Sequence, residues 1–313
     1  MALDRKRLAL EVAALLVVVA LIVTFATRNR GDSGRHVDHR FMMGTIVSVT
    51  VLTPDADAGR AAIEAAFDEI ARVEALTTRY SDDSEISRLN ALSDGYTGEH
   101  VSREVAEVVG RSLAIAEVSS GAFDITVAPL VDAWTLPGGE LAPPDESRIR
   151  EALLHVDWSA VHADTAFRTM TVEPGTELDL AGVAKGYAVD RAVAALRRAG
   201  VGAGIVDAGG DVGFVGTPPD PGGWRVGIKH PRTDGLLGVV VLDGGSVATS
   251  GDYQRFAMVD GVRYHHIFDP STGYPARGVM SVTVAPELAV DAAALATAVF
   301  VLGPEDGMEL IER

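Results

Sequence analysis

The sequence of 313 residues contains no cysteine. This absence excludes disulfide bonds, thiolate metal sites, a cysteine nucleophile and a lipid-modified cysteine anchor. Positive charge is also scarce, because 27 Lys and Arg stand against 44 Asp and Glu, for a formal net charge of −17. Proteins bind phosphate backbones mainly through Lys and Arg, so we expect no nucleic-acid partner. A small anionic ligand would need local help from a lysine, from backbone amides or from a divalent cation.

The common nucleotide-binding motifs are missing as well. There is no Walker loop and no G-x-G-x-x-G after a strand, and the segment Gly209–Gly213 is too short a match for a dinucleotide fingerprint. The expected helices and strands are interleaved irregularly instead of alternating. The sequence therefore predicts an α+β fold and not a doubly wound parallel sheet.

One long hydrophobic run lies near the N-terminus. Residues Val12–Thr27 carry no charge and follow the basic residues Arg5–Arg7, as in a signal peptide or a signal anchor. The length of the run and the lack of a small-x-small cleavage site before Arg28 favour a retained anchor. We expect residues 1–30 to form one transmembrane helix in the cytoplasmic membrane, with the folded body on the extracytoplasmic side.

The rest of the chain is expected to form one domain over residues 41–313, after a polar linker at 31–40. The β-type alternation of residues 41–52 predicts a strand with one buried face. Apolar spacing of three and four, together with capping residues, predicts helices over 55–76, 102–119, 184–198 and 291–302, and a short helix after Pro304. Short Val-rich runs through 224–286 predict further strands.

Several glycine-bearing segments place polar side chains within apolar sequence, a pattern typical of ligand-binding loops on a rigid scaffold. In Leu178–Tyr187 a strand ends at Asp179, and a turn of small residues leads into a helix that begins near Ala184. A helix N-terminus with Lys185 beside it attracts anions. A plain turn with a solvated lysine is the structural alternative for this segment taken alone.

The segment Ser119–Thr126 ends a helix in a glycine turn and presents Phe123 and Asp124. If exposed, these two side chains would stack on an aromatic ring system and hydrogen-bond to it. A capping turn over a core phenylalanine explains this segment equally well on its own.

The segment His265–Pro275 is a strand that leads into a turn containing proline and glycine. His266 and Asp269 are a natural pair for proton transfer near neutral pH. The paired histidines are alternatively core residues or metal ligands, but no third His or Cys lies at zinc spacing.

Together with Met43–Thr45, Arg79–Asn90 and Asp291–Thr297, these segments resemble the ApbE family along most of the chain. The resemblance implies an ApbE-like fold of mixed sheets with packed helices. It also implies FAD:protein FMN transferase activity, in which FMN moves from FAD to a threonine of an acceptor protein and AMP is released, with Mg²⁺ as cofactor. A non-catalytic FAD carrier or assembly module, or an FAD pyrophosphatase, stays open as an alternative.

The resemblance further assigns roles to individual residues. His266 becomes the candidate general base, and Mg²⁺ would be held by the backbone carbonyl of Gly182 and the hydroxyl of Thr297. The residues implied to contact FAD are Met43, Tyr80, Ala122, Phe123, Asp124, Asp179, Lys185 and Ile267.

One position departs from the family pattern, in which Asp-x-x-x-Thr supplies two metal ligands from one helix face. Here the residue four before Thr297 is Ala293. Asp291 is the nearby carboxylate, but on a regular helix it would point about 240° away from Thr297. We therefore expect Asp291 to serve as a metal ligand only if it precedes the first helical turn, where its dihedrals are free; otherwise it is a simple N-cap.

Overall fold

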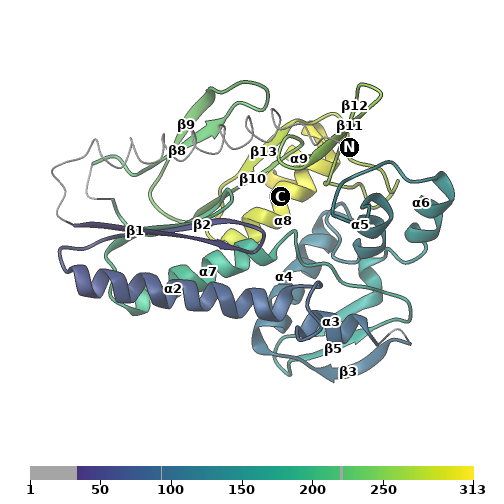
Figure 1. Ribbon diagram of the computed structural model, residues 1–313, viewed down its shortest axis with the longest axis horizontal. Coiled ribbons are helices and arrows are strands. Elements are labelled where there is room, and N and C mark those ends of the chain that lie inside the picture. Colours follow the sequence, from purple (N-terminus) through teal and green to yellow (C-terminus); the bar gives the residue numbers. More distant parts are fainter. Residues whose placement is uncertain (1–33, 93, 219–220) are drawn as a thin grey trace, which may run out of the picture.

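The structure is a computed structural model that describes residues 34–92, 94–218 and 221–313 (Figure 1). The hydrophobic run at residues 12–27 lies outside these ranges, so the transmembrane helix stays a prediction. Within these ranges, no helix combines the length and the apolar character needed to cross a bilayer.

A six-stranded antiparallel sheet forms the centre of the domain (Figure 1). In spatial order its strands are β1 (Arg35–Met42), β2 (Thr45–Leu52), β6 (Ala203–Ala208), β7 (Asp211–Gly216), β10 (Ser246–Gly251) and β13 (Ser281–Val284). Val47, Val49 and Val51 of β2 are fully buried, as the alternation in the sequence predicts.

The strand β1 takes in residues 35–40, which the sequence analysis assigned to a linker. That assignment is wrong for these residues, because β1 pairs with β2 along its whole length, from Arg35 opposite Leu52 to Met42 opposite Thr45. β1 lies at the edge of the sheet and none of its residues is fully buried, so its polar composition does not resemble that of an interior strand.

Three helices pack on the central sheet and on one another: α2 (Ala56–Thr77), α7 (Ala184–Arg198) and α8 (Ala289–Leu302). α2 lies against β1 and β2, α7 against β6 and β7, and α8 against β10 and β13. α2 and α7 run along the same side of the sheet (Figure 1). The predicted helices at 55–76 and 184–198 are confirmed, and Asp55 caps α2 by accepting from Asp57 N and Ala58 N.

The contact between α7 and α8 is unusually close, and it positions two segments of the site described below. Gly186 of α7 has no side chain where it meets the backbone of Ala289, and a Cβ atom there would lie only 2.3 Å from the Ala289 oxygen. Asp190 of α7 also accepts hydrogen bonds from Ala289 N at 2.8 Å and Val290 N at 2.9 Å. These bonds satisfy two of the free amides at the start of α8.

The remaining elements surround this core. A three-stranded sheet has the order β3 (Tyr96–His100), β5 (Thr169–Val172), β4 (Val161–Asp164). Two hairpins are β8 (Trp224–Lys229) with β9 (Leu236–Leu242), and β11 (Phe256–Val259) with β12 (Val262–His265). The other helices are α3 (Glu85–Asn90), α4 (Arg103–Val118), α5 (Ala128–Trp134), α6 (Glu146–Leu153), the 3₁₀ turn η1 (Trp158–Ala160) and α9 (Pro304–Glu312).

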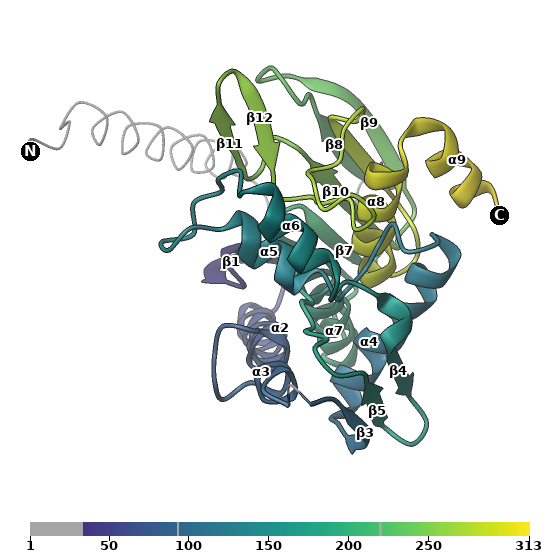
Figure 2. The same cartoon turned by 90° about the vertical axis from the view of Figure 1, so that its right-hand side faces the viewer.

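Helices α5 and α6 pack together and form a lobe beside the β11–β12 hairpin (Figure 2). Trp134 at the end of α5 links the two parts, since its ring lies 5.5 Å from that of Tyr264 and 5.7 Å from that of Phe268. Its indole nitrogen also donates to the Gly273 oxygen at 2.8 Å. The mixed helix and sheet content confirms the predicted α+β class.

Candidate functional site

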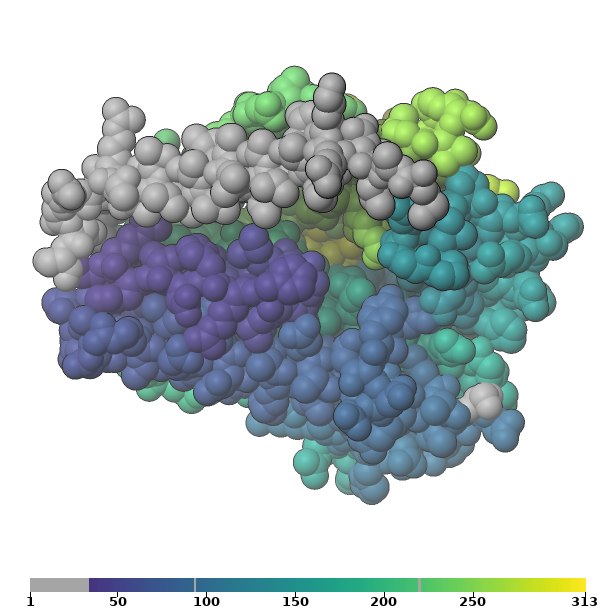
Figure 3. All heavy atoms as spheres, viewed as in Figure 1, coloured from purple at the N-terminus to yellow at the C-terminus, as the bar shows by residue number. Residues whose placement is uncertain are grey.

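A cleft opens between two parts of the molecule. One part is the central sheet with α7 and α8, and the other is the α5–α6 lobe. In the space-filling view a hollow separates the purple β1–β2 hairpin from the teal lobe (Figure 3). Counted out to its mouth and including open solvent, the cleft holds about 1150 Å³ of space. Its lining includes these residues that the sequence analysis selected: Tyr80, Ala122, Phe123, Asp124, Asp179, Gly182, Lys185, His266, Ile267 and Thr297.

Phe123 and Asp124 form one wall of the cleft. The chain reaches them through a left-handed turn after α4, with φ of 53° at Ser120 and 83° at Gly121. The sequence analysis considered an exposed pair, but only 3% of Phe123 and 7% of Asp124 is exposed. Phe123 is covered because Gly182 packs over its ring without a side chain; a Cβ atom at Gly182 would lie 3.2 Å from the ring.

The carboxylate of Asp124 is held by neighbouring segments. It accepts hydrogen bonds from Thr126 N and Thr126 Oγ1, both at 2.7 Å, and from Trp158 N at 3.1 Å. Burial raises the pKa of Asp124 above its ordinary value, although these hydrogen bonds oppose the shift. Both carboxylate oxygens therefore already have protein partners.

Asp179 lies five residues before the start of α7 at Ala184. It accepts from Ala181 N at 2.8 Å, and its second oxygen lies 3.7 Å from Nη1 of Arg79. Burial raises the pKa of Asp179, and the bond from Ala181 and the charge of Arg79 only partly offset this effect. Arg79 also pairs with Asp132 of α5, so it ties the wall of the cleft to the α5–α6 lobe.

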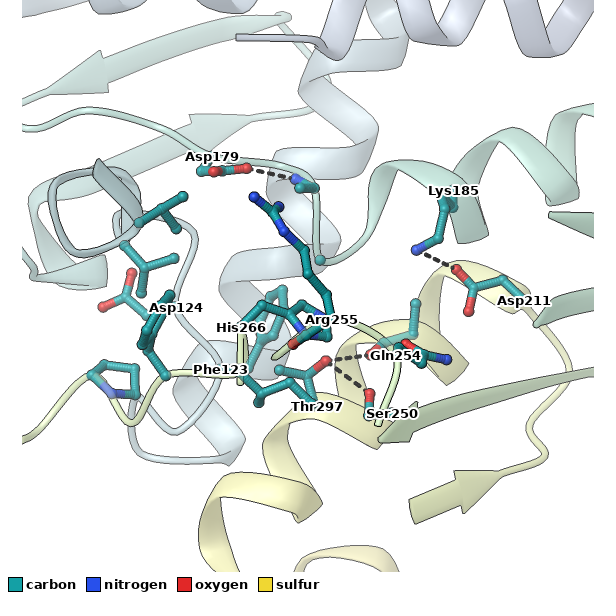
Figure 4. Close-up of a pocket in the computed structure, with 18 of the residues that line it drawn as sticks. Phe123, Asp124, Asp179, Lys185, Asp211, Ser250, Gln254, Arg255, His266 and Thr297 are labelled. Carbon is teal, nitrogen blue, oxygen red and sulfur yellow. Dashed lines mark hydrogen bonds and ion pairs between the residues drawn. The ribbon is translucent and has the colours of Figure 1, made fainter. Parts of the chain in front are cut away.

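Lys185 lies in the first turn of α7 and forms an ion pair with a residue of the adjacent strand β7. Its Nζ is 3.1 Å from Oδ2 of Asp211, the first residue of β7 (Figure 4). Asp211 is 6% exposed and lines the cleft. α7 itself begins without a side-chain cap. The start of this helix therefore offers backbone amides and an ammonium group to an anion.

His266 follows β12 and projects into the cleft (Figure 4). Its Nδ1 is 3.1 Å from the backbone oxygen of Arg255. A carbonyl oxygen can only accept, so Nδ1 donates and the neutral ring keeps a lone pair at Nε2. Burial lowers the pKa of His266 to about 4, so the ring is neutral at pH 7.

The pairing of His266 with Asp269 that the sequence analysis considered is not formed. Asp269 instead accepts from Ser271 N at 2.9 Å and from Ser271 Oγ at 2.6 Å, which closes the local turn before Gly273. A short-range turn bond of this kind competes with the longer reach to the histidine.

Thr297 of α8 reaches the cleft together with Ser250 of β10. Their hydroxyl oxygens are 3.2 Å apart, and Thr297 Oγ1 also donates to the Ala293 oxygen at 3.1 Å (Figure 4). Ala293 lines the cleft one turn before Thr297, where the family pattern has its aspartate. The site therefore has two hydroxyl groups at this point but no carboxylate from α8.

Asp291 is not at the cleft. α8 begins at Ala289, so Asp291 lies inside its first turn, and the condition under which it would swing toward the metal is not met. Its carboxylate instead pairs with Nη1 of Arg111 on α4, 3.1 Å from each oxygen. Leu288, not Asp291, is the N-cap residue.

A sequence model of the ApbE family matches residues 43–313. The chain belongs to the ApbE family. Among curated relatives, the FAD:protein FMN transferase of Treponema pallidum is 34% identical over 87% of this chain and 80% of its own length, and that of Vibrio cholerae is 31% identical over 86% and 82%.

Solved structures of ApbE proteins agree with this assignment. The ApbE protein of Thermotoga maritima superposes with a TM-score of 0.82 at 37% identity, covering 89% of this chain and 90% of that one. The apo flavinyl transferase ApbE of Pseudomonas stutzeri superposes with a TM-score of 0.78 at 31% identity, covering 89% and 88%. The predicted ApbE-like fold is therefore confirmed.

Two further family positions differ in how they relate to the cleft. Tyr80 stands at its mouth and is 74% exposed, so its ring is free to cover a bound ligand. Met43 is not among the residues that line the cleft. It occupies a left-handed turn between β1 and β2 with φ of 52°, and its amide donates to Glu74 of α2 at 2.7 Å.

Sequence reasoning missed several residues of the ApbE cleft. Asp211 was considered only as part of a short glycine-rich match. Ser250 belongs to β10 and was not singled out. The further cleft residues Gln254 and Arg255 follow β10 in sequence. Charge-bearing residues just after glycine turns were the available signal.

Proposed function

We propose that this ApbE protein transfers FMN from FAD to a threonine hydroxyl of an acceptor protein and releases AMP. The observation that carries this proposal is the convergence of Phe123, Lys185 and His266 on one cleft. These residues come from three separate segments, and they supply an aromatic wall, a cation and a neutral base. The relatives named FAD:protein FMN transferase support the same reaction.

FAD would lie along the cleft with its pyrophosphate near the start of α7. Lys185 and the uncapped amides of this helix favour negative charge there, against the repulsion of a chain with net charge −17. Tyr80 and Ile267 offer apolar surface to the rings of the dinucleotide. Asp124 and Asp179 line the same wall and are fixed by hydrogen bonds from backbone amides.

The oxygen groups near α8 suit a hard divalent cation such as Mg²⁺, which prefers oxygen ligands. Thr297 and Ser250 contribute hydroxyl groups, and Gly182 lies exposed in the cleft with its backbone carbonyl. Oδ2 of Asp211 is buried, and within the described part of the chain its partner is the ammonium group of Lys185. When bound, the cation would neutralise charge on the pyrophosphate as AMP leaves.

The chemical step requires a base for the acceptor hydroxyl. The threonine oxygen would attack the FMN-side phosphorus, forming a P–O bond as the bond to the AMP phosphate breaks. The lone pair at His266 Nε2 would take the hydroxyl proton, because Nδ1 is engaged by the Arg255 oxygen. A neutral ring at pH 7 is in the protonation state that this role needs.

The test uses the full-length chain in detergent with FAD, Mg²⁺ and a flavin-acceptor domain that presents a threonine. We expect flavin fluorescence on the acceptor band in a denaturing gel. The variant His266→Asn should bind FAD but lose about 10²–10⁴-fold in transfer rate. As a matched control, His100→Asn changes an exposed histidine of β3 and should keep the parental rate.

Two results would contradict the proposal. Free FMN and AMP without labelled acceptor would identify an FAD pyrophosphatase. FAD that stays intact, and binds equally well with a chelator present, would identify a carrier.

We also propose that residues 1–30 anchor the protein in the cytoplasmic membrane, with the ApbE domain on the extracytoplasmic side. The uncharged run Val12–Thr27 after three basic residues supports this location. Membrane fractionation together with external protease digestion of spheroplasts tests it. Recovery of the whole chain in the cytosolic fraction would contradict it.

A further inference from the structure

We infer that Asp211 of β7 supplies the carboxylate ligand for the divalent cation that residue 293 lacks. This inference rests on the proposed function, which places a cation beside Thr297. Position 293 holds alanine, and Asp291 is paired with Arg111 away from the cleft. A cation that bridges a pyrophosphate is usually held by one or two protein carboxylates, so the site requires one from another element.

Among the described residues, three carboxylates line the cleft, and backbone amides hold two of them. Asp124 accepts three hydrogen bonds that use both of its oxygens. Asp179 accepts from Ala181 with one oxygen and faces Arg79 with the other. In the described residues, Oδ2 of Asp211 has no hydrogen-bond partner of good geometry, although it is buried. Asp211 is therefore the one of the three whose buried oxygen is held by the Lys185 ammonium alone.

The sheet register sets Asp211 on the same face as Ala293, the position on α8 that lacks the carboxylate. β7 pairs with β10 through Val212 opposite Val247, and continuing this register by one residue would set Asp211 opposite Ala248. Residues directly opposite in an antiparallel pair point to the same face, with Cβ atoms roughly 5 Å apart. Ala248 packs in one small cluster with Ala292 and Ala293 of α8. On this register Asp211 and Ala293 lie on the same face of the sheet, and both line the cleft.

The partner of Asp211 fits this role. Lys185 Nζ lies 3.1 Å from Oδ2 and neutralises the carboxylate without an aligned hydrogen bond. Figure 4 shows this pair to the right of Ser250 and Gln254, on the side away from Asp124. Lys185 is also the residue proposed to contact the pyrophosphate. When the ammonium group moves to a phosphate, the carboxylate loses its counter-charge and is open to a cation.

The test measures Mn²⁺ binding to the full-length protein in detergent, with FAD present, from the loss of the free-ion EPR signal. We expect Asp211→Asn to weaken Mn²⁺ binding by about tenfold or more. The matched control Asp145→Asn removes the same charge from an exposed residue outside the cleft and should change Mn²⁺ affinity by less than twofold. The double variant Asp211→Asn with Ala293→Asp should recover most of the parental affinity, because it returns a carboxylate to the site.

Two further measurements separate ligation from a positioning role and from misfolding. With EDTA, Asp211→Asn should bind FAD at least as tightly as the parent, since Lys185 loses a competing partner. Without FAD, Lys185→Met should bind Mn²⁺ more tightly than the parent, which a misfolded protein would not do. An unchanged Mn²⁺ affinity in Asp211→Asn overturns the assignment, as does weaker FAD binding by that variant in EDTA. A parent protein that transfers FMN without any bound Mn²⁺ or Mg²⁺ overturns the assignment while leaving the transferase function intact.

Discussion

The close contact between α7 and α8 makes Gly186→Ala a sharp test of how the cleft is held together. A Cβ atom at Gly186 would lie 2.3 Å from the Ala289 oxygen and 2.7 Å from its carbonyl carbon. An acceptable carbon–oxygen contact is roughly 3.3 Å, so the helices would have to separate by about 1 Å. The obstructing atoms belong to backbone, and they cannot move aside as the end of a side chain can.

The expected loss of stability combines two unfavourable effects with one favourable effect. Overpacking costs about 1–3 kcal/mol, while alanine in place of glycine inside a helix gains about 1 kcal/mol. The shift of α8 would also strain the two bonds from Ala289 N and Val290 N to Asp190, each worth about 1.5–3 kcal/mol when the acceptor is charged. We expect the free energy of unfolding to fall by about 2–4 kcal/mol, and Tm by roughly 3–7 °C.

The same displacement should impair the reaction, because Lys185 precedes Gly186 while Thr297 is carried by α8. A misplacement of about 1 Å between groups that act together costs on the order of 100-fold in rate. The assays are thermal unfolding and FMN transfer by the full-length chain. Gly110→Ala in α4 is the matched control, since its Cβ would meet only the methyl of the exposed Thr165. If Gly186→Ala melts and reacts like Gly110→Ala, the α7–α8 contact does not hold the site.

Three other expectations follow from single contacts. Because burial lowers the pKa of His266 to about 4, kcat/KM should stay level down to about pH 5, and a limb near 6.5 would contradict this lowered pKa. Burial raises the pKa of Asp190 to about 6, so the parent loses stability as pH rises from about 4 to 6. The Tm of Asp190→Asn relative to the parent should therefore rise over that range. A Tm difference that stays constant with pH would contradict the raised pKa. Trp134→Phe removes the bond to the Gly273 oxygen and should lower the free energy of unfolding by about 1–3 kcal/mol in urea titration, while no change would show that water replaces it.

The helices were predictable because their signals are local. Ser102 accepts from Val105 N at the start of α4, and α7 spans Ala184–Arg198 as the spacing of apolar residues predicts. The strands that were missed lack such signals. β6 and β7 are joined through Gly209 and Gly210, and β3 is polar and mostly exposed. Pairing with a partner strand, which no local pattern records, decides these segments.

The same distinction explains what could be predicted about the cleft. The motifs around Phe123, Lys185 and His266 were recognisable along the chain, since each combines a turn with a functional side chain. The partners of these residues were not, because Arg255 and Asp211 are set opposite them by tertiary packing.

Position 293 shows why this limit matters for function. In the sequence of α8, Ala293 indicates a lost metal ligand, and the nearest carboxylate on the same helix is Asp291. In space the neighbours of Ala293 come from β10, and through β10 from β7. A ligand lost from a helix can therefore be compensated from an adjacent strand far away in sequence, provided that the strand directs an acceptor to the same point. The effect of Ala293 on cation binding therefore depends on the geometry of the whole cleft and not on one helix.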